Sequence, residues 1–493
     1  MSTFFIISTI IAACFFIALK KTKNRQPPPR ELQTHIAQQN KATQTHNLSQ
    51  IHNHRNEYFK TKNRIPNNFI LTDELTNAFE IIENTKKNIY ITGKAGTGKS
   101  TLLTYFRQHT KKNIVVLAPT GVAALNVEGS TIHSFFKFPT RLLEPCDKAI
   151  KKDARRHDLF KKLNILIIDE VSMVRADLMD AIDYSLQINR DDKRPFGGVQ
   201  IVIFGDVFQL PPVVKEKTLD DYLNSNYGGP YFFNAKSFSE NAFEYIELSE
   251  IFRQKDDVFR NILNMVRNNT INDKTLNLLN EKHDSSTHTS KGVVLTLCTT
   301  NDISTKINAT QMEALPTDAF SYHAEIKGIF DKSAYPTDPS LTLKVGAQIM
   351  MLKNDAMQRW VNGTLGIIET LTGNSIEVNI DGRCYHVDKA TWEGIDYQYD
   401  KGTNKIEAII TGSFTQYPIK PAWAITIHKS QGQTFDRVNI HLGNGAFAHG
   451  QTYVALSRCT SLGGISLKTK IRKTDIKVDP KVTNFASKNI KHT

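Results

Sequence analysis

Nearly continuous apolar stretches recur through the first half of the chain, and helical or polar segments separate them. Such stretches are typical of strands that are buried on both faces of a parallel sheet. They are residues 88–91, 114–118, 163–168 and 199–204. Helices are expected over 71–82 and 101–106, on either side of the first stretch. This alternation predicts an open parallel α/β sheet whose connecting loops meet at one edge.

A second α/β unit is expected to begin with residues 247–254. It opens with an amphipathic helix, because apolar residues recur there at helical spacing. The apolar face of this helix consists of Phe259, Ile262, Leu263 and Val266. Apolar strands follow at 293–297 and 346–352, and the chain returns to this unit at 422–432 and 453–458.

The region from about 357 to 414 has a different pattern. Its apolar runs are short and are joined by turn signals at Gly373-Asn374 and Asp381-Gly382. The expected strands are 367–371, 375–380 and 383–387. This pattern predicts a small β-barrel-like insertion in the second α/β unit.

The N-terminal segment differs from both units. Residues 3–19 are almost entirely apolar and are followed by Lys20-Lys21-Thr22-Lys23, which predicts a single membrane anchor at 1–23 with a cytoplasmic basic flank. The alternatives are a buried hydrophobic helix and a misassigned start. Residues 24–68 are polar, contain three successive prolines and are expected to be a flexible linker.

The composition adds a basic charge balance to this picture. The 493 residues carry a net charge of +13, although both termini contribute to the excess, including an expected basic tail at 476–493. A basic balance favours an anionic polymer or an anionic membrane surface as partner. The five cysteines lie far apart and form no C-x-x-C pair, so neither a disulfide framework nor a zinc site is indicated.

A phosphate-binding loop is predicted at residues 93–100. Gly93, Gly98, Lys99 and Ser100 match the pattern G-x-x-x-x-G-K-[ST] between an expected strand and an expected helix. Backbone N–H groups of such a loop point at phosphates, while the lysine neutralises them and the hydroxyl contacts Mg²⁺. The alternative is a glycine turn without a ligand. The predicted contacts are Gly93, Ala95, Gly96, Thr97, Gly98, Lys99, Ser100 and Thr101.

Polar residues follow three of the expected buried strands. Asp169 and Glu170 end one strand, where one carboxylate can hold Mg²⁺ and the other can activate water; the alternative is a helix N-cap pair. Gln209 lies just beyond another strand and can contact a terminal phosphate, although a glutamine in a proline-rich turn is usually structural. His133 lies in an aromatic-flanked segment that suits a polymer backbone, or it is a capping or core histidine.

The ordered motifs resemble those of the Pif-type (petite integration frequency) helicases, which are superfamily-one DNA helicases related to RecD. The resemblance runs from about residue 71 to 467. It rests on GKAGTGKS, LAPTGVAA, TIHSFF, IDEVSM, PFGG, GDVFQLPPV, FRQ, GAQIMMLKN, NGTLG, AITIHKSQG and YVALSR, in this order.

The resemblance implies an α/β fold with two RecA-like P-loop parallel-sheet domains. The first would span 69–245, with a small 1B insertion at about 121–140. The second would comprise 246–356 and 415–475, with an SH3-like 2B insertion at 357–414.

The same resemblance implies a role for each matching residue. Lys99 and Ser100 would bind phosphates and Mg²⁺, Asp169 would hold Mg²⁺, and Glu170 would be the base. Gln209 would contact the γ-phosphate, and Arg253 and Arg458 would be arginine fingers from the second domain. Residues in the motifs that grip DNA phosphates are Thr120, His133, Thr426, His428 and Lys429.

The implied activity is ATP- and Mg²⁺-dependent 5′-to-3′ unwinding of DNA by a monomer that tracks on single-stranded and forked DNA. The N-terminal anchor would add inner-membrane association. An alternative is a nucleic-acid-stimulated ATPase that remodels RNA or protein–nucleic acid complexes without processive unwinding. A glutamine that reads adenine in related proteins has no counterpart at Leu71-Thr72-Asp73-Glu74-Leu75, so the selectivity for ATP is left open.

Overall fold

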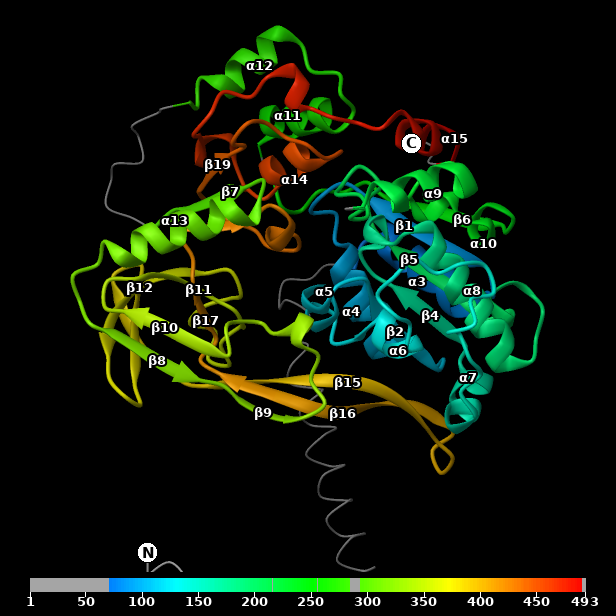
Figure 1. Ribbon diagram of the computed structural model, residues 1–493. Coiled ribbons are helices and arrows are strands. Elements are labelled where there is room, and N and C mark those ends of the chain that lie inside the picture. The colour runs from blue at the N-terminus through cyan, green and yellow to red at the C-terminus, as the bar shows by residue number, and fades with distance from the viewer. Residues whose placement is uncertain (1–70, 215, 255, 284–292, 490–493) are drawn as a thin grey trace, which may run out of the picture. The chain divides into compact units, whose positions relative to one another are not determined.

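The computed structural model describes residues 71–489, apart from 215, 255 and 284–292 (Figure 1). The expected anchor at 1–23 and the expected linker at 24–68 therefore lie outside the described residues. Among the helices of the described part, none has the length and apolar character that crossing a bilayer requires.

The first α/β unit contains a six-stranded parallel sheet in the order β3-β2-β4-β5-β1-β6. The central strands are buried along almost their whole length, which confirms the expectation from their apolar runs. The strands are β1 (Asn88–Gly93), β2 (Ile114–Ala118), β3 (Ser130–Thr131), β4 (Ile165–Ile168), β5 (Gln200–Phe204) and β6 (Phe243–Leu248). The helices of this unit are α3 (Asp73–Asn84), α4 (Lys99–His109), α5 (Gly121–Asn126), α6 (Ile132–Phe136), α7 (His157–Lys162), α8 (Ala176–Arg190), α9 (Lys217–Tyr227) and α10 (Lys236–Ser239).

The second α/β unit contains a four-stranded parallel sheet in the order β18-β7-β19-β20. Its strands are β7 (Leu295–Cys298), β18 (Ala424–Thr426), β19 (Val438–His441) and β20 (Ile465–Leu467). Its helices are α11 (Asp257–Arg267), α12 (Asp273–Asn280), α13 (Asn301–Glu313) and α14 (Gln451–Ser457). The four apolar residues expected on one face of α11 are all buried.

Antiparallel strands form the third part of the described chain. A five-stranded sheet has the order β14-β13-β12-β11-β17, and two smaller sheets pair β10 with β8 and β15 with β16 and β9. The strands are β8 (Ala319–His323), β9 (Glu325–Gly328), β10 (Ser340–Lys344), β11 (Gln348–Met351), β12 (Leu365–Leu371), β13 (Ile376–Ile380), β14 (Arg383–Val387), β15 (Ala390–Asp400), β16 (Lys405–Gln416) and β17 (Ile419–Pro421).

One strand lies in a different sheet from the one expected. Residues 346–352 were expected in the second parallel sheet, but β11 pairs antiparallel with β12 and β17. All four residues of β11 are buried, so its sequence lacks the alternation that would mark an antiparallel strand.

The long hairpin β15–β16 crosses from the antiparallel strands to the first α/β unit (Figure 1). Tyr397 of β15 places its hydroxyl 3.1 Å from both the N–H and the carbonyl oxygen of Val116 in β2. Arg156, just before α7, forms an ion pair with Asp396 at 3.1 Å. The hairpin thus attaches to the first parallel sheet through buried polar contacts.

The expected basic tail contains a helix, α15 (Pro480–Asn489). Val482 and Ala486 of this helix are buried, and Phe485 stacks on Phe233 of the first unit. Just before the helix, Asp479 accepts a hydrogen bond from the Tyr231 hydroxyl at 2.6 Å. The C-terminal segment therefore runs from the second α/β unit back to the first.

Candidate nucleotide and nucleic-acid site

The predicted phosphate loop lies between β1 and α4. Gly96 and Gly98 have φ values of 87° and 84°, which L-residues with a Cβ rarely adopt. At Gly96 a Cβ would also lie 2.5 Å from the Cβ of Arg253. Gly98 is the N-cap of α4 and provides no capping side chain, so the first N–H groups of the helix face the loop, as an anion site requires.

Lys99 is held inside this loop. Its ammonium donates hydrogen bonds to the carbonyl oxygens of Gly93 at 2.6 Å and Lys94 at 2.9 Å. Burial lowers the pKa of Lys99 to about 8, while the carboxylates of Asp206 and Glu170 oppose that shift. An anion that entered the loop would add a counter-charge and favour the protonated form.

Two carboxylates lie at the end of β4, as the sequence predicts. Asp169 donates its backbone N–H to Leu117 of β2 at 2.9 Å, and Glu170 adopts the left-handed region with φ 51°. Burial, followed by the charge of Glu170, raises the pKa of Asp169 to about 7. The pKa of Glu170 is also raised by burial, while Lys99 and Arg458 favour its charged form.

The donor set fits a magnesium ion. Ser100 lies exposed in the first turn of α4, and Asp169 supplies a buried carboxylate whose pKa is raised by burial and by the charge of Glu170, so a bound cation would favour its charged form. A hydroxyl, one carboxylate and phosphate oxygens of a nucleotide are typical Mg²⁺ ligands. The described residues contain no cluster of three or more His, Cys, Asp or Glu that could hold a metal by itself.

Residues 252–254 bring the second unit against this loop. The N–H of Phe252 donates to the carbonyl of Gly96 at 2.9 Å. Arg253 donates to the carbonyl of Ser457 at 3.3 Å, and Gln254 donates to the same oxygen at 3.1 Å. The predicted arginine Arg253 therefore lies between the loop and the end of α14.

Arg458, the other predicted arginine, directly follows α14 and is almost fully buried. Its guanidinium donates to the carbonyl of Val454 at 3.1 Å and to the Ser457 hydroxyl at 3.0 Å. Burial, with a contribution from Arg253, lowers the pKa of Arg458 to about 9, and Glu170 opposes that shift. Both arginines thus lie within electrostatic range of Glu170.

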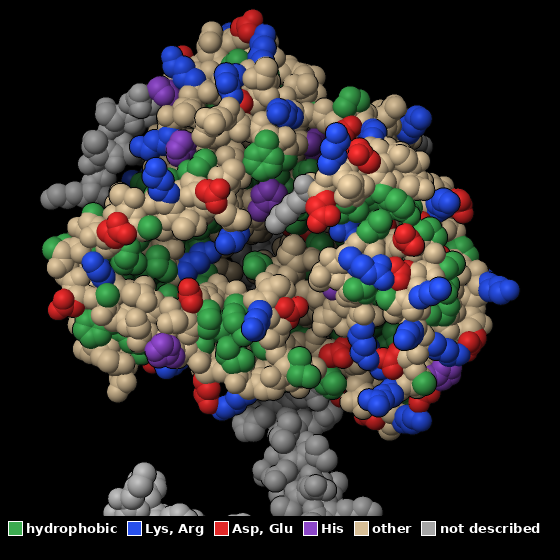
Figure 2. Space-filling model, in the orientation of Figure 1, with side chains coloured by type: hydrophobic (Ala, Val, Ile, Leu, Met, Phe, Trp, Pro, Cys, Tyr) green, Lys and Arg blue, Asp and Glu red, His purple; other side chains and the backbone are tan. Residues whose placement is uncertain are grey.

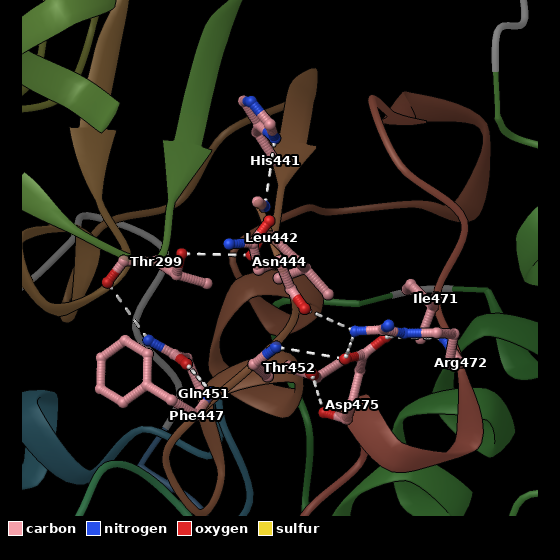
Figure 3. Close-up of polar contacts among 12 residues, drawn as sticks. Thr299, His441, Leu442, Asn444, Phe447, Gln451, Thr452, Ile471, Arg472 and Asp475 are labelled. Atoms are coloured by element: carbon pink, nitrogen blue, oxygen red, sulfur yellow. Dashed lines mark hydrogen bonds and ion pairs between the residues drawn. The ribbon is translucent and has the colours of Figure 1, made fainter. Parts of the chain in front are cut away.

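Polar contacts fix the helix that carries Arg458 at its start (Figure 3). Gln451 donates to the Thr299 carbonyl at 3.4 Å and accepts from the N–H of Phe447 at 3.0 Å. The hydroxyl of Thr452 donates to the carbonyl of Asp475. These contacts attach α14 to the end of β7 and to the segment before α15.

Sequence reasoning missed three residues of this site. Asp206 and Arg267 form an ion pair at 3.0 Å, with side chains that are 0% and 2% exposed. Tyr453 of α14 contacts both Asp206 and the phosphate loop. The sequence contains a signal for Arg267: it lies four residues after Leu263, so a charged residue occurs on the otherwise apolar face of α11, where it needs a buried partner. Gln209 is buried beside this group, and its N–H donates to the Asp206 carbonyl at 2.9 Å.

The five predicted DNA contacts lie at or shortly after the ends of β2, β3 and β18. Thr120 is the N-cap of α5 and accepts the N–H of Ala123 at 3.2 Å, and His133 lies in α6. Thr426 ends β18 and accepts the N–H of Lys429 at 3.4 Å, and the Lys429 side chain is exposed. Burial lowers the pKa of both His133 and His428, which favours neutral rings. The face in Figure 2 is hollowed near its centre, with Lys and Arg side chains along part of the hollow.

The two parallel sheets, the phosphate loop and the arginines beside it define a P-loop nucleotide-binding fold with two α/β domains. Profile matches agree: PIF1-like helicase covers residues 70–277, and the 2B domain of DNA helicase Pif1 covers 332–371. Pif1 of Bdellovibrio bacteriovorus, an ATP-dependent DNA helicase, is 32% identical over 429 residues, which are 84% of this chain and 91% of that protein. The chain therefore belongs to the PIF1-like helicase family.

Other similar proteins include a relative that is longer than this chain and proteins whose structures have been solved. The mouse ATP-dependent DNA helicase PIF1 is 34% identical over 81% of this chain, and the match spans 60% of that relative. Bacteroides sp Pif1 in complex with ADP-AlF4 is 40% identical with a TM-score of 0.79, over 85% of this chain and 97% of that one. Bacteroides Pif1 bound to ssDNA is 41% identical with a TM-score of 0.64, over the same shares.

Proposed function

We propose that the chain is an ATP-dependent DNA helicase that translocates 5′ to 3′ on single-stranded DNA and opens forked duplexes. The observation that carries this proposal is the approach of Arg253 and Arg458, both from the second α/β unit, to Glu170 of the first. A motor needs a nucleotide site whose catalytic charges come from two parts that can separate. The names and ligands of the relatives support the choice of ATP and DNA.

Each residue has a defined task in this proposal. The N–H groups from Gly96 to Thr101 and the Lys99 ammonium bind the phosphates, with Mg²⁺ held by Ser100 and Asp169. Gly93 and Ala95 line the loop, and the Ala95 N–H donates to the Tyr453 hydroxyl. Glu170 orients and deprotonates the attacking water, and the cations beside it oppose the rise in its pKa that burial causes. Gln209 contacts the terminal phosphate. Arg253 and Arg458 stabilise the negative charge that develops as the phosphate bond breaks.

The loops after β2, β3 and β18 form the DNA grip in this proposal. Thr120 and His133 hold phosphates from the first unit, while Thr426, His428 and Lys429 hold them from the second. Neutral histidines and hydroxyls donate single hydrogen bonds to phosphate oxygens without selecting a base. Hydrolysis would then change the spacing of the two grips and move the chain along the strand.

A forked duplex tests the proposal directly. A protein comprising residues 69–493 should unwind a forked duplex that has a 5′ single-stranded tail but not one that has only a 3′ tail. Lys99→Ala should abolish both ATP hydrolysis and unwinding. Hydrolysis that DNA stimulates without unwinding of either fork would contradict it. Stronger stimulation by RNA than by DNA would instead support an RNA-directed remodelling ATPase.

Two narrower expectations belong to the same proposal. If the protein is a monomer, light scattering at micromolar concentration should give the molar mass of one chain. The anchor at 1–23 predicts that the full chain, but not the chain lacking these residues, is recovered in the membrane fraction.

A further inference from the structure

The hydroxyl of Tyr453 connects the phosphate loop to the turn that carries Gln209. Tyr453 lies in α14 of the second unit, and its side chain is 3% exposed. Its oxygen accepts the N–H of Ala95 at 3.0 Å and its proton faces the Asp206 carboxylate, 3.5 Å away. One buried oxygen from the second unit thus bonds two segments of the first.

Asp206 organises the turn on which Gln209 lies. One carboxylate oxygen accepts the N–H of Phe208 at 3.1 Å, and the Asp206 carbonyl accepts the N–H of Gln209 at 2.9 Å. The same carboxylate pairs with Arg267 of α11, whose guanidinium lies 4.0 Å above the Phe208 ring. A buried ion pair contributes little net stability, but it requires a defined geometry between the two charged groups, so it fixes the position of α11 relative to this turn.

The start of α14 is also held close to Gln209. Gly450 has φ 69°, and a Cβ there would lie 2.4 Å from the Phe208 carbonyl oxygen and 2.6 Å from that of Gln209. Only glycine permits this approach. Arg458 directly follows the other end of the helix, about one and a half turns beyond Tyr453. Any rotation of α14 about this contact would move Arg458 relative to Glu170.

We propose that Tyr453 is a positioning residue that acts through Arg458. Its hydroxyl fixes the rotation of α14 relative to the phosphate loop and to the turn that carries Gln209. When these two segments bind the nucleotide, this rotation places Arg458 at the reacting phosphate. This inference rests on the proposed function, because it requires Arg458 to stabilise the transition state of hydrolysis. Tyr453 itself touches neither substrate nor metal.

Tyr453→Phe tests the proposal because it removes only the hydroxyl. With saturating single-stranded DNA, we expect kcat for ATP hydrolysis to fall about tenfold, which corresponds to about 1.4 kcal/mol. We expect KM for ATP and the affinity for a fluorescent ADP to stay within about twofold, because the loop N–H groups and Lys99 that bind phosphates are retained. Tyr417→Phe is the matched control: Tyr417 is equally buried, and its hydroxyl donates to the Asn374 carbonyl at 2.9 Å, far from this site in the antiparallel region.

A double-mutant cycle with Arg458→Ala separates positioning from general stability. If Tyr453 acts through Arg458, Tyr453→Phe should lower kcat by less than about twofold in the Arg458→Ala background. An unchanged kcat in the single variant, or a full tenfold loss in both backgrounds, would overturn the inference. If Tyr453→Phe does not fold, Arg267→Lys provides the test, since it keeps the charge beside Asp206 but loses the guanidinium geometry and should give the same loss of kcat without a change in KM.

Failure of the proposed function gives a different result. A wild-type chain without DNA-stimulated hydrolysis, or an Arg458→Ala variant with the wild-type rate, would contradict the function itself. An active wild type that depends on Arg458 but not on the Tyr453 hydroxyl would contradict only the positioning role.

Discussion

Phe485 of α15 and Phe233 of the first α/β unit lie nearly parallel, with ring centroids 4.3 Å apart and ring planes 7° apart. Phe232, Phe238 and Tyr245 surround the same ring with centroids 5.9–6.1 Å away. A helix whose chain enters from the second unit therefore completes an aromatic cluster of the first. Apolar burial of this kind stabilises the contact between the units without any residue of the nucleotide site.

Phe485→Ala is expected to lower the free energy of unfolding by about 2 kcal/mol, which is less than the loss for a fully buried phenylalanine because this ring is only partly buried. Urea denaturation followed by tryptophan fluorescence measures the change. Phe447→Ala is the control, because that side chain is 59% exposed and its removal should cost less than about 0.5 kcal/mol. Equal losses in the two variants would show that α15 does not pack as described.

The hairpin β15–β16 provides a second stability test. Tyr397→Phe would remove the buried hydroxyl that now accepts a hydrogen bond from the N–H of Val116 and donates one to its carbonyl oxygen. We expect a loss of about 2 kcal/mol, since unpaired buried N–H and carbonyl groups are costly. Tyr399→Phe, in the same hairpin, removes a hydroxyl that bonds only Asn404 of that hairpin and should change stability by less than about 0.5 kcal/mol. A Tyr397→Phe variant as stable as Tyr399→Phe would contradict the docking of the hairpin.

Local sequence signals predicted the parts of the molecule that local chemistry determines. The phosphate loop and the Asp169–Glu170 pair follow buried strands, and the loop glycines have the positive φ values that such a turn needs. Contacts between distant segments had no such signal: nothing in the sequence pairs Tyr453 with Ala95, 358 residues away.

Two further differences have simple physical causes. A strand such as β11, in which every residue is buried, does not show by alternation whether its partners are parallel or antiparallel, so it was placed in the wrong sheet. The C-terminal helix did carry a signal, because Val482, Phe485 and Ala486 have helical spacing. The many lysines nearby led to the expectation of a tail alone.

His449 predicts a pH dependence of stability. Its Nδ1 accepts the N–H of Asp479 at 3.1 Å, and its Nε2 donates to the Val207 carbonyl at 2.9 Å, so the folded chain holds the neutral ring. Burial lowers the pKa of His449 below its usual value, although the carboxylates of Asp479 and Asp206 favour the charged form. The unfolded chain therefore binds a proton more readily, and stability is lost as pH falls below about 6.5.

The corresponding measurement compares the wild type with His449→Gln by urea denaturation at pH 5 and pH 7. The wild type should lose stability toward pH 5, and the variant should lose about 1 kcal/mol less over the same interval because its amide does not titrate. The other histidines are common to both chains and cancel in the difference. A variant with the wild-type pH dependence would show that His449 is not held neutral.

Glu170→Gln separates nucleotide binding from hydrolysis. The amide keeps the size of the side chain but cannot accept the proton of the attacking water, so we expect kcat to fall by about 10² or more. Nucleotide affinity should be retained or should increase, because a buried carboxylate near the phosphates is replaced by a neutral amide. Fluorescent nucleotide titration and steady-state hydrolysis with single-stranded DNA measure the two quantities. Glu240→Gln, at an exposed position, is the control and should leave both unchanged. If Glu170→Gln instead weakened binding and kept kcat, Glu170 would be a ligand-binding group, and the base of the reaction would have to be sought among the other carboxylates of the site, Asp169 and Asp206.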